Sequence, residues 1–196
     1  MVVRNMIRTV LVVCLSIWLS GEATAQKDTV AVSFGYFAPY GVQVGGKTGL
    51  SFNLKSWTVE RENRSNKIRK IDVSPQVGYF FFPGVQNNLL LNCDVAYSVA
   101  KSGARVVPIA SIGLGYLLAR QRQEGTVNLA TGELKQDVKT LHYFTPTVNA
   151  GFAVSTKRSM SYFMKAFYGR KIGFQQEDAS FFGLELGLSV KLKREN

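Results

Sequence analysis

The stretch 182-FGLELGLSVKL-192, near the end of the chain, alternates strictly between large apolar residues and small or polar ones. The apolar positions are Phe182, Leu184, Leu186, Leu188, Val190 and Leu192. Successive side chains of a β-strand point to opposite sides, so a period of two predicts a strand with one apolar and one polar face. The stretch also has the length, roughly 9–11 residues, that a tilted strand needs to cross a lipid bilayer.

The other end of the chain has the features of a secretory signal peptide. Arg4 and Arg8 precede the apolar stretch 10–19, and the sequence ATA at 23–25 is a small-x-small cleavage site. We therefore expect a signal peptide at 1–25 and one mature domain at 26–196. The apolar stretch is shorter than the roughly 20 residues of a membrane-spanning helix. No later segment is apolar over such a length, so any insertion into a membrane must use strands.

Cysteine content and charge narrow the class further. Cys93 is the one cysteine left after cleavage, which excludes an intramolecular disulfide. The whole chain carries a formal net charge of +11, which suits anionic lipid or lipopolysaccharide as a partner. Export and the lack of a recognition motif argue against nucleic acid.

Seven more stretches alternate in the same way, at 30–36, 50–59, 71–81, 89–99, 110–118, 144–154 and 160–168. In the second of them the register slips before Trp57, which predicts a β-bulge. In the last of them Phe163 and Phe167 blur the alternation. Together with 182–192 the sequence predicts eight strands, an even number and the smallest common size of bacterial membrane barrels.

The predicted connections alternate between two ends of such a barrel. If the first strand runs outward from the periplasm, the periplasmic turns are 61–66, 100–104 and 155–159. The external connections are then 38–47, 83–88, 120–138 and 171–179. Short periplasmic turns and longer external loops are typical of this class. Pro75, Pro108 and Pro146 fall inside predicted strands, and we expect them at strand ends or bulges because proline lacks the N–H that a ladder needs.

The composition of the polar faces indicates which side meets lipid. These faces are rich in Gly, Ala and Ser, whereas an exterior in water would carry long charged side chains. Small residues fit the narrow interior of an eight-stranded barrel, and the large apolar faces then point outward. We therefore predict an all-β fold, an antiparallel up-and-down transmembrane β-barrel of eight strands. The alternative is a soluble exported barrel that turns its apolar side inward around a lipid.

With its signal, its eight alternating strands and its alternating terminus, the chain resembles the small outer-membrane β-barrel proteins of the OmpA/OmpX-like eight-stranded group. It resembles especially the uncharacterised Bacteroidetes-type barrels. The resemblance covers the mature chain as a pattern and implies residence in the outer membrane, with lipid and lipopolysaccharide around the barrel. The chain departs from the group at its end, where KREN at 193–196 stands in place of a terminal aromatic residue.

His142 is the only histidine and the one candidate for catalysis. Outer-membrane lipid A deacylases resemble this architecture and use a histidine, a nearby serine and an acidic residue. His142 has no serine close in sequence, and Ser111 or Ser161 would reach it only through the fold. We interpret His142 as structural and expect no enzymatic activity, no catalytic residue, no cofactor and no metal site. A lipid A-modifying hydrolase is the alternative.

Charged residues on the predicted polar faces indicate a polar cluster inside the barrel. The predicted lumen cluster is Asp72, Asp94, Lys165, Glu185 and Lys191. Buried charges must be paired or solvated, so we expect salt bridges that fill the lumen. A path for protons or ions is the alternative.

Basic residues gather at the predicted periplasmic turns. This basic periplasmic rim is formed by Arg61, Arg64, Arg69, Lys157 and Arg158. Long basic side chains at this level bind lipid phosphates. A sharper hypothesis is that the rim docks an acidic protein partner.

The sequence thus favours a non-enzymatic outer-membrane barrel with a structural or interaction role through its external loops, of which 120–138 is the longest. An alternative is a barrel that assists secretion or assembly through its basic periplasmic rim.

Overall fold

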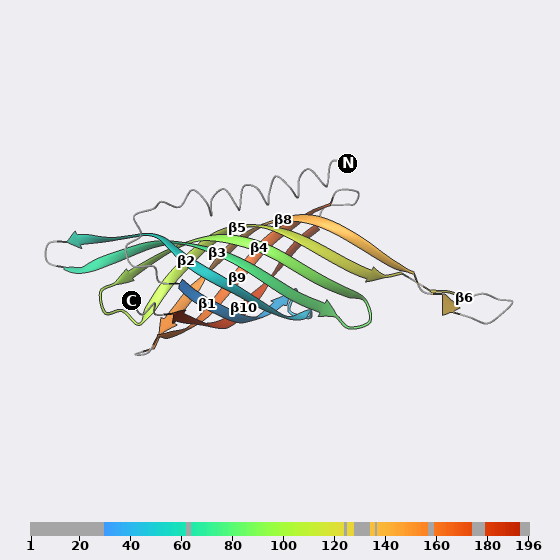
Figure 1. Cartoon of the computed structure of the whole chain (residues 1–196), viewed down its shortest axis with the longest axis horizontal. Helices are drawn as coiled ribbons and strands as arrows, with labels where there is room; N and C mark the ends of the chain where they lie inside the picture. Colours follow the sequence, from blue (N-terminus) through green and yellow to red (C-terminus); the bar gives the residue numbers. More distant parts are fainter. Residues whose placement is uncertain are drawn as a thin grey trace.

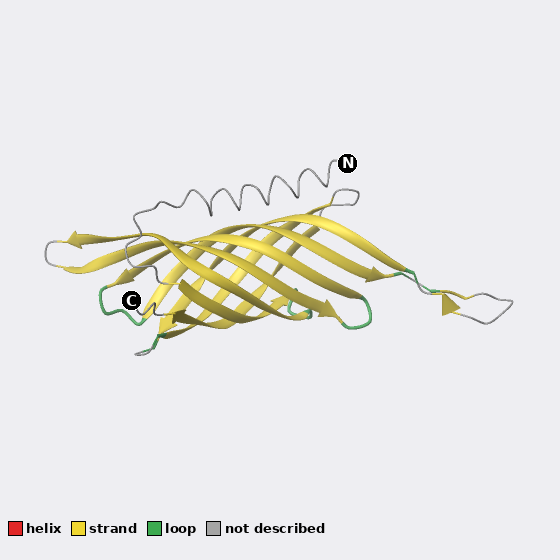
Figure 2. Ribbon diagram, in the orientation of Figure 1, coloured by secondary structure: helices red, strands yellow, loops and turns green. Residues whose placement is uncertain are grey.

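Eight long antiparallel strands close into a barrel in the computed structural model, which describes residues 30–61, 64–123, 125–127, 134–135, 137–156, 159–173 and 179–192 (Figures 1 and 2). The barrel strands are β1 (Val30–Pro39), β2 (Val44–Arg61), β3 (Arg64–Phe82), β4 (Gln86–Lys101), β5 (Val106–Arg122), β8 (Val138–Ser155), β9 (Met160–Gly173) and β10 (Ala179–Leu192). Each strand pairs with its neighbour in sequence, and β1 pairs with β10 to close the barrel. The predicted all-β, eight-stranded, up-and-down barrel is therefore confirmed.

A small hairpin of β6 (Thr126–Val127) and β7 (Leu134–Lys135) lies in the connection between β5 and β8. β6 lies beyond one end of the barrel, which we term the loop end (Figure 1). The start of β1 and the end of β10 pair with one another at the opposite end, which we term the termini end. No helix in the described part of the chain is long and apolar enough to span a membrane. The predicted signal peptide lies outside the described residues.

The predicted bulge in the second strand is confirmed. The register between β2 and β3 shifts between Asn53 and Lys55, which leaves Leu54 as an extra residue. Beyond it the outward positions of β2 change from even to odd numbers, so Trp57 joins the outer face and its ring lies 6.4 Å from that of Tyr97. Where the alternation in the sequence shifts by one residue, a bulge takes up the extra residue and keeps the apolar side chains on one face.

The expectation for the three prolines is right for Pro108 and wrong for the other two. Pro108 is the third residue of β5 and lies beyond the last residue pair between β4 and β5. Pro75 and Pro146 lie in the interior of β3 and β8. Each keeps its place in the ladder on one side, opposite Cys93 and Leu114 respectively. On the other side the pairing lapses for two residue pairs, because proline offers no N–H there.

The strands run longer than the alternation predicts, and their connections are shorter. The predicted external connection 38–47 shrinks to a turn between Pro39 and Val44. Lys47, which we placed in that loop, is therefore a residue of β2, and its side chain is buried in the lumen. Polar residues near strand ends form backbone hydrogen bonds with the next strand as well as apolar residues do. The alternation of apolar and polar residues alone therefore underestimates the length of the strands.

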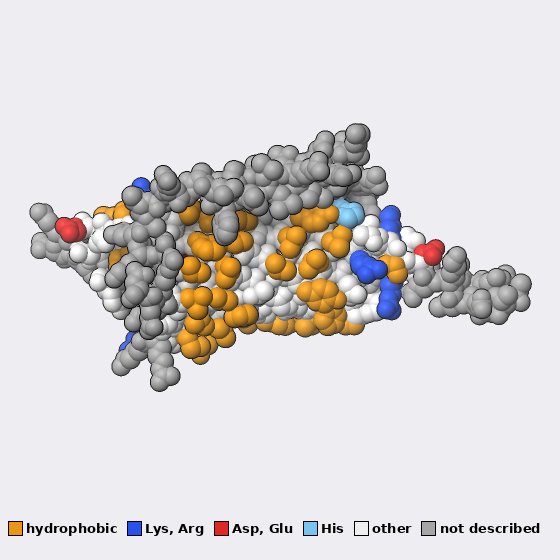
Figure 3. Space-filling model, in the orientation of Figure 1, with side chains coloured by type: hydrophobic (Ala, Val, Ile, Leu, Met, Phe, Trp, Pro, Cys, Tyr) orange, Lys and Arg blue, Asp and Glu red, His pale blue; other side chains and the backbone are white. Residues whose placement is uncertain are grey.

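The two faces of the barrel wall have the predicted chemistry. Large apolar side chains point outward on every strand and are among the most exposed of the molecule, for example Ile112 (65%), Leu114 (62%), Phe182 (59%) and Val148 (58%). On the side shown in Figure 3 they gather over the middle of the barrel, with Lys and Arg toward its two ends. The lumen instead holds buried polar residues and glycines. An outer band of this kind is what a bilayer covers in a membrane barrel.

Replacing Ile112 with Lys tests this placement. In a bilayer the charge at the middle of the outer band is expected to destabilise the barrel by about 2–4 kcal/mol. Val106→Lys is the matched control, because Val106 is also exposed (54%) but begins β5 at the termini end. There the expected cost is about 0–1 kcal/mol. Unfolding by urea in lipid vesicles measures both. Equal, small effects of the two lysines would point to a barrel with water outside.

Candidate functional site

Six buried apolar side chains close the lumen toward the loop end. This aromatic plug consists of Phe37, Phe80, Leu90, Leu117, Phe167 and Phe181, which come from six different strands. The rings of Phe37 and Phe167 stack with their centroids 4.5 Å apart, and Phe80 contacts Phe37 edge-on at 5.4 Å. Phe80 and Leu117 are fully buried. The buried side chains of six of the eight barrel strands therefore pack together inside the lumen at this level.

The turn between β1 and β2 covers the plug. Tyr40, which has a positive φ of 54°, donates a hydrogen bond from its hydroxyl to the carbonyl oxygen of Ser180 at 2.7 Å. Burial, and next the neighbouring Tyr143, raise the pKa of Tyr40 above its ordinary value, so the hydroxyl stays protonated and able to donate. Lys171 extends beneath it, with Nζ 5.5 Å from the ring centroid of Tyr40 and 5.7 Å from that of Phe181. This cap ties β1, β9 and β10 together at the loop end.

A buried ion pair lies in the same lumen. Lys47 Nζ of β2 is 2.8 Å from Glu185 Oε2 of β10, and the two side chains are only 5% and 4% exposed. Gly35 of β1 stands between them, where its missing side chain leaves room. Lys165 of β9 is the cross-strand neighbour of Glu185. Lys47 and Lys165 also lie over the rings of Phe37 and Phe163, at 5.3 and 4.8 Å.

The predicted lumen residues do not form the single network of salt bridges that we expected. Asp94 is buried on the opposite wall, where Asn92 donates to it at 2.6 Å and Asn149 at 3.4 Å. Asp72 is half-buried and accepts a hydrogen bond from Asn53 at 2.8 Å. Lys191 is exposed at the termini end. The expected pairing was wrong for two reasons. Glu185 forms its ion pair with Lys47, which we had assigned to a loop. Asp72 and Asp94 accept hydrogen bonds from asparagine amides and form no ion pair within the described residues.

The predicted basic rim is described only in part. Lys157 and Arg158 lie outside the described residues, as do the side chains of Arg61 and Arg64. The backbone places Arg61 opposite Arg64 at the tip of the β2–β3 hairpin. Pairing of β2 with β1 ends at Phe52, so the hairpin projects beyond the barrel at the termini end (Figure 1). Arg69 lies below the tip, where β3 pairs with Trp57 of β2 on one side and with Val99 of β4 on the other.

His142 lies on the outer face near the loop end and not beside a serine. Its Nδ1 is 2.5 Å from the hydroxyl of Tyr116 on β5. The next residue of β8 on the same face is Phe144, whereas Ser111 points into the lumen and accepts a hydrogen bond from Asn149. Ser161 lies far along β9, opposite Ser189. The fold thus brings neither candidate serine to His142. In the described ranges no three His, Cys, Asp or Glu residues gather as a metal site would require.

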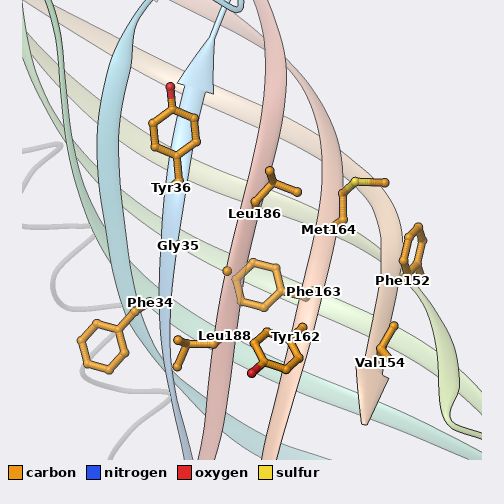
Figure 4. A pocket seen from close by; sticks show the side chains of 11 residues that line it. Phe34, Gly35, Tyr36, Phe152, Val154, Tyr162, Phe163, Met164, Leu186 and Leu188 are labelled. Atoms are coloured by element: carbon orange, nitrogen blue, oxygen red, sulfur yellow. The ribbon is translucent and has the colours of Figure 1, made fainter. Parts of the chain in front are cut away.

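A shallow apolar groove crosses the outer wall over β1, β10, β9 and β8 (Figure 4). Its rim includes Phe34, Tyr36, Leu186 and Met164, and the ring of Phe163 lies behind it. Side chains on Gly35 or Gly187 would collide with or crowd this ring, since their Cβ atoms would stand 3.4 and 2.5 Å from Phe163 Cζ. The glycines therefore let an aromatic ring pack against the inner wall, and the groove is part of the outer apolar band.

The lumen residues that sequence reasoning missed carry a recognisable signal. Phe37, Phe80 and Phe181 stand at positions of the polar face, and Phe163 and Phe167 are the two that blurred the alternation. A large apolar residue on the face of small residues is the mark of a plug inside the barrel. The position of Lys47 in the glycine-rich start of β2 had no comparable signal.

Comparisons with known proteins support the fold. No protein-family model matches the sequence, and no curated protein matches it at a significant level. Among solved structures, the chain is similar to the outer membrane enzyme PagL, with 16% identity over 83% of this chain and 99% of that one, and a TM-score of 0.52. It is also similar to the N-terminal barrel of Pseudomonas aeruginosa OprF (17% identity, 85% and 98% covered, TM-score 0.48) and to Neisserial surface protein A (14% identity, 84% and 97% covered, TM-score 0.47). At such identities the likeness to PagL shows the eight-stranded barrel fold alone.

Proposed function

We propose that the protein is a non-enzymatic outer-membrane barrel that acts through surfaces outside its lumen, chiefly the connection 120–138. The single observation that carries this proposal is the aromatic plug. Phe37, Phe80 and Phe167 fill the lumen near the loop end, and eight strands leave little room around them. With the lumen closed near the loop end, contact with other macromolecules falls to the two ends and the outer face.

The outer-membrane location is supported by the apolar outer band and by the expected signal peptide. Lipid surrounds the band, and basic side chains near both ends suit the phosphates of lipid and lipopolysaccharide. No cofactor enters the proposal. A lipid A hydrolase is less favoured, because His142 contacts Tyr116 and has Phe144 where a serine partner on its own strand face would stand.

The loop end carries the longest connection between barrel strands, from Arg122 to Val138. β5 and β8 continue to pair up to Arg122 and Val138, whereas pairing of β8 with β9 begins only at Tyr143. β8 therefore extends beyond β9 on one flank of this hairpin, while β5 stays paired with β4 up to Gln121 on the other (Figure 1). A scaffold of paired strands is a favourable base for a binding loop.

A second candidate function is docking of an acidic partner at the termini end. The observation that favours it is the projecting β2–β3 hairpin. Lys67, Arg69 and Lys70 lie along β3 just below the tip, where β3 also pairs with β4. Lys55 and Trp57 lie on β2, with Lys55 Nζ 5.8 Å from the indole centroid. Such a basic surface with an aromatic residue suits an acidic protein segment.

One experiment separates the two functions. One variant replaces residues 124–136 with a short Gly-Ser turn, and a second carries Arg61→Glu, Arg64→Glu and Arg69→Glu. The loop replacement lies beyond the last pair of β5 and β8, and Arg61 and Arg64 lie at a hairpin tip, whereas Arg69 pairs with Trp57 and Val99 within the sheet. Heat-dependent gel mobility therefore checks first that both proteins still fold as membrane barrels. Cross-linking in whole cells, followed by purification and mass spectrometry, then compares the partners.

We expect the loop variant to lose the cross-linked partners and the rim variant to retain them. If only the rim variant loses the cross-linked partners, the termini end and not the connection 120–138 is the binding surface. Partners that persist in both variants would refute both proposals. A loop variant that no longer folds would show that 124–136 is part of the barrel scaffold.

A further inference from the structure

A polar hollow lies in the lumen wall over β5, on the side opposite the Lys47–Glu185 pair. Gly113 and Gly115 occupy consecutive inward positions of β5. In register, Gly113 stands between Asp94 of β4 and Thr147 of β8, and Gly115 stands between Asn92 and Thr145. In each of these two cross-strand rows, a glycine of β5 without a side chain lies between a polar residue of β4 and a polar residue of β8.

The oxygen atoms of the flanking side chains converge over the two glycines. A Cβ atom on Gly113 would collide with Asp94 Oδ1 and stand 2.5 Å from Thr147 Oγ1. A Cβ atom on Gly115 would stand 2.6 Å from Thr145 Oγ1 and 2.9 Å from Asn92 Oδ1. Four side-chain oxygen atoms from β4 and β8 therefore stand over the two glycines. Asn92 Nδ2 lies 3.1 Å from the Cβ position of Gly113, and the carbonyl oxygen of Leu91 lies 3.0 Å from that of Gly115.

These oxygens lack the partners that buried polar atoms normally have. Asn92 Oδ1, Thr145 Oγ1 and Thr147 Oγ1 are buried and make no hydrogen bond within the described part of the chain. The residues that carry them are only 7%, 0% and 7% exposed. Three buried oxygens without a protein partner at adjoining ladder positions call for an occupant that donates to them or coordinates them, either water or a cation.

Asp94 adds one negative charge to the hollow. The residue is 2% exposed, and its carboxylate accepts hydrogen bonds from the amides of Asn92 and Asn149. Within the described ranges the one ion pair is Lys47–Glu185, so Asp94 has no cationic side chain beside it. A buried carboxylate without a counter-charge is costly.

We propose that the hollow over Gly113 and Gly115 binds a monovalent cation of the Na⁺ class, with Asp94, Asn92, Thr145 and Thr147 as its oxygen ligands. Hard cations take carboxylate, carbonyl and hydroxyl oxygens. One carboxylate among neutral oxygens balances a single positive charge, whereas strong Ca²⁺ sites use several carboxylates. The cation enters from the termini end, where the lumen is lined by Ser51, Ser74 and Asp72, because the aromatic plug closes the other end.

The test compares thermal unfolding of the whole folded protein in NaCl, KCl and choline chloride at one ionic strength of about 0.15 M, so that screening is equal. A cation that binds only the folded state stabilises it by RT ln(1 + c/Kd), where c is the concentration of the free cation. We expect the midpoint in NaCl to exceed that in choline chloride by roughly 3 °C or more for the unaltered protein. Asp94→Asn and Thr147→Val should each abolish this difference.

Asp72→Asn is the matched control, because it removes the same charge from the same lumen outside the hollow, and it should keep the difference. Equal midpoints of the unaltered protein in all three salts, or an Na⁺ increment that survives in both hollow variants, would overturn the proposal and leave water as the occupant. Should Asp94→Asn fail to fold, Thr147→Val decides, since it changes no charge. Crystals soaked in a thallium(I) salt give an independent readout. An anomalous peak beside Asp94 supports the site, and water density without such a peak contradicts it.

Discussion

Replacing Glu185 with Gln is expected to destabilise the barrel by about 3–5 kcal/mol. Its carboxylate lies 2.8 Å from Lys47 Nζ, and both side chains are almost fully buried. Lys165 is its cross-strand neighbour on β9. Loss of the carboxylate leaves two ammonium groups near one another in a narrow lumen with no anion between them. Unfolding by urea in lipid vesicles measures the loss.

Two further variants show whether the pairing itself is responsible. Lys47→Gln is expected to cost less than Glu185→Gln, because Lys165 remains beside the carboxylate. The double variant Lys47→Met with Glu185→Leu should regain most of the stability, since an apolar pair can replace a buried ion pair at little cost. A loss below about 1 kcal/mol for Glu185→Gln would mean that the pair is as well hydrated as one on a surface.

Replacing Phe80 with Ala is expected to cost about 3–5 kcal/mol, the usual range for removing a buried ring. Phe80 is fully buried and contacts Phe37 at the centre of the aromatic plug. Phe81, the next residue of β3, points outward and is 37% exposed, which makes Phe81→Ala a close control. Lipid chains can fill the space that Phe81 leaves, so its loss should cost clearly less. Equal costs would show that the plug is loosely packed.

The aromatic plug should also determine whether the barrel conducts ions. The unaltered protein is expected to conduct no measurable current in a planar bilayer, whereas the combined change of Phe37, Phe80 and Phe167 to Ala should produce small-ion currents. Steady current through the unaltered protein would contradict the sealed lumen and with it the main support for the proposed function.

The predictions from sequence succeed where the information is local. Period-two alternation predicts eight strands and their outward faces because the direction of a side chain in a strand depends only on its position along that strand. The bulge before Trp57 follows from the same rule, and the structure confirms it in the register shift at Asn53 and Lys55. The expectation that proline lies at strand ends or bulges fails for Pro75 and Pro146. Each of these residues interrupts the pairing on one side of its strand, while the pairing on the other side continues.

Contacts inside the lumen depend instead on closure of the barrel. Lys47 and Glu185 are 138 residues apart in sequence and meet only because β1 pairs with both β2 and β10. Nothing in either neighbourhood of the sequence shows that their side chains have the same height in the lumen, because that height follows from the stagger between strands. The plug and the hollow over Gly113 and Gly115 depend on the same stagger.

The eight strands, their two faces and the outward direction of the apolar face follow from neighbouring residues, and all three can be predicted from the amino-acid sequence. The aromatic plug, the pairing of Lys47 with Glu185, and the position of Asp94 beside buried oxygens of β4 and β8 emerge only when the barrel closes. Closure brings distant strands into register, and all eight strands then contribute to the charge and volume of the lumen.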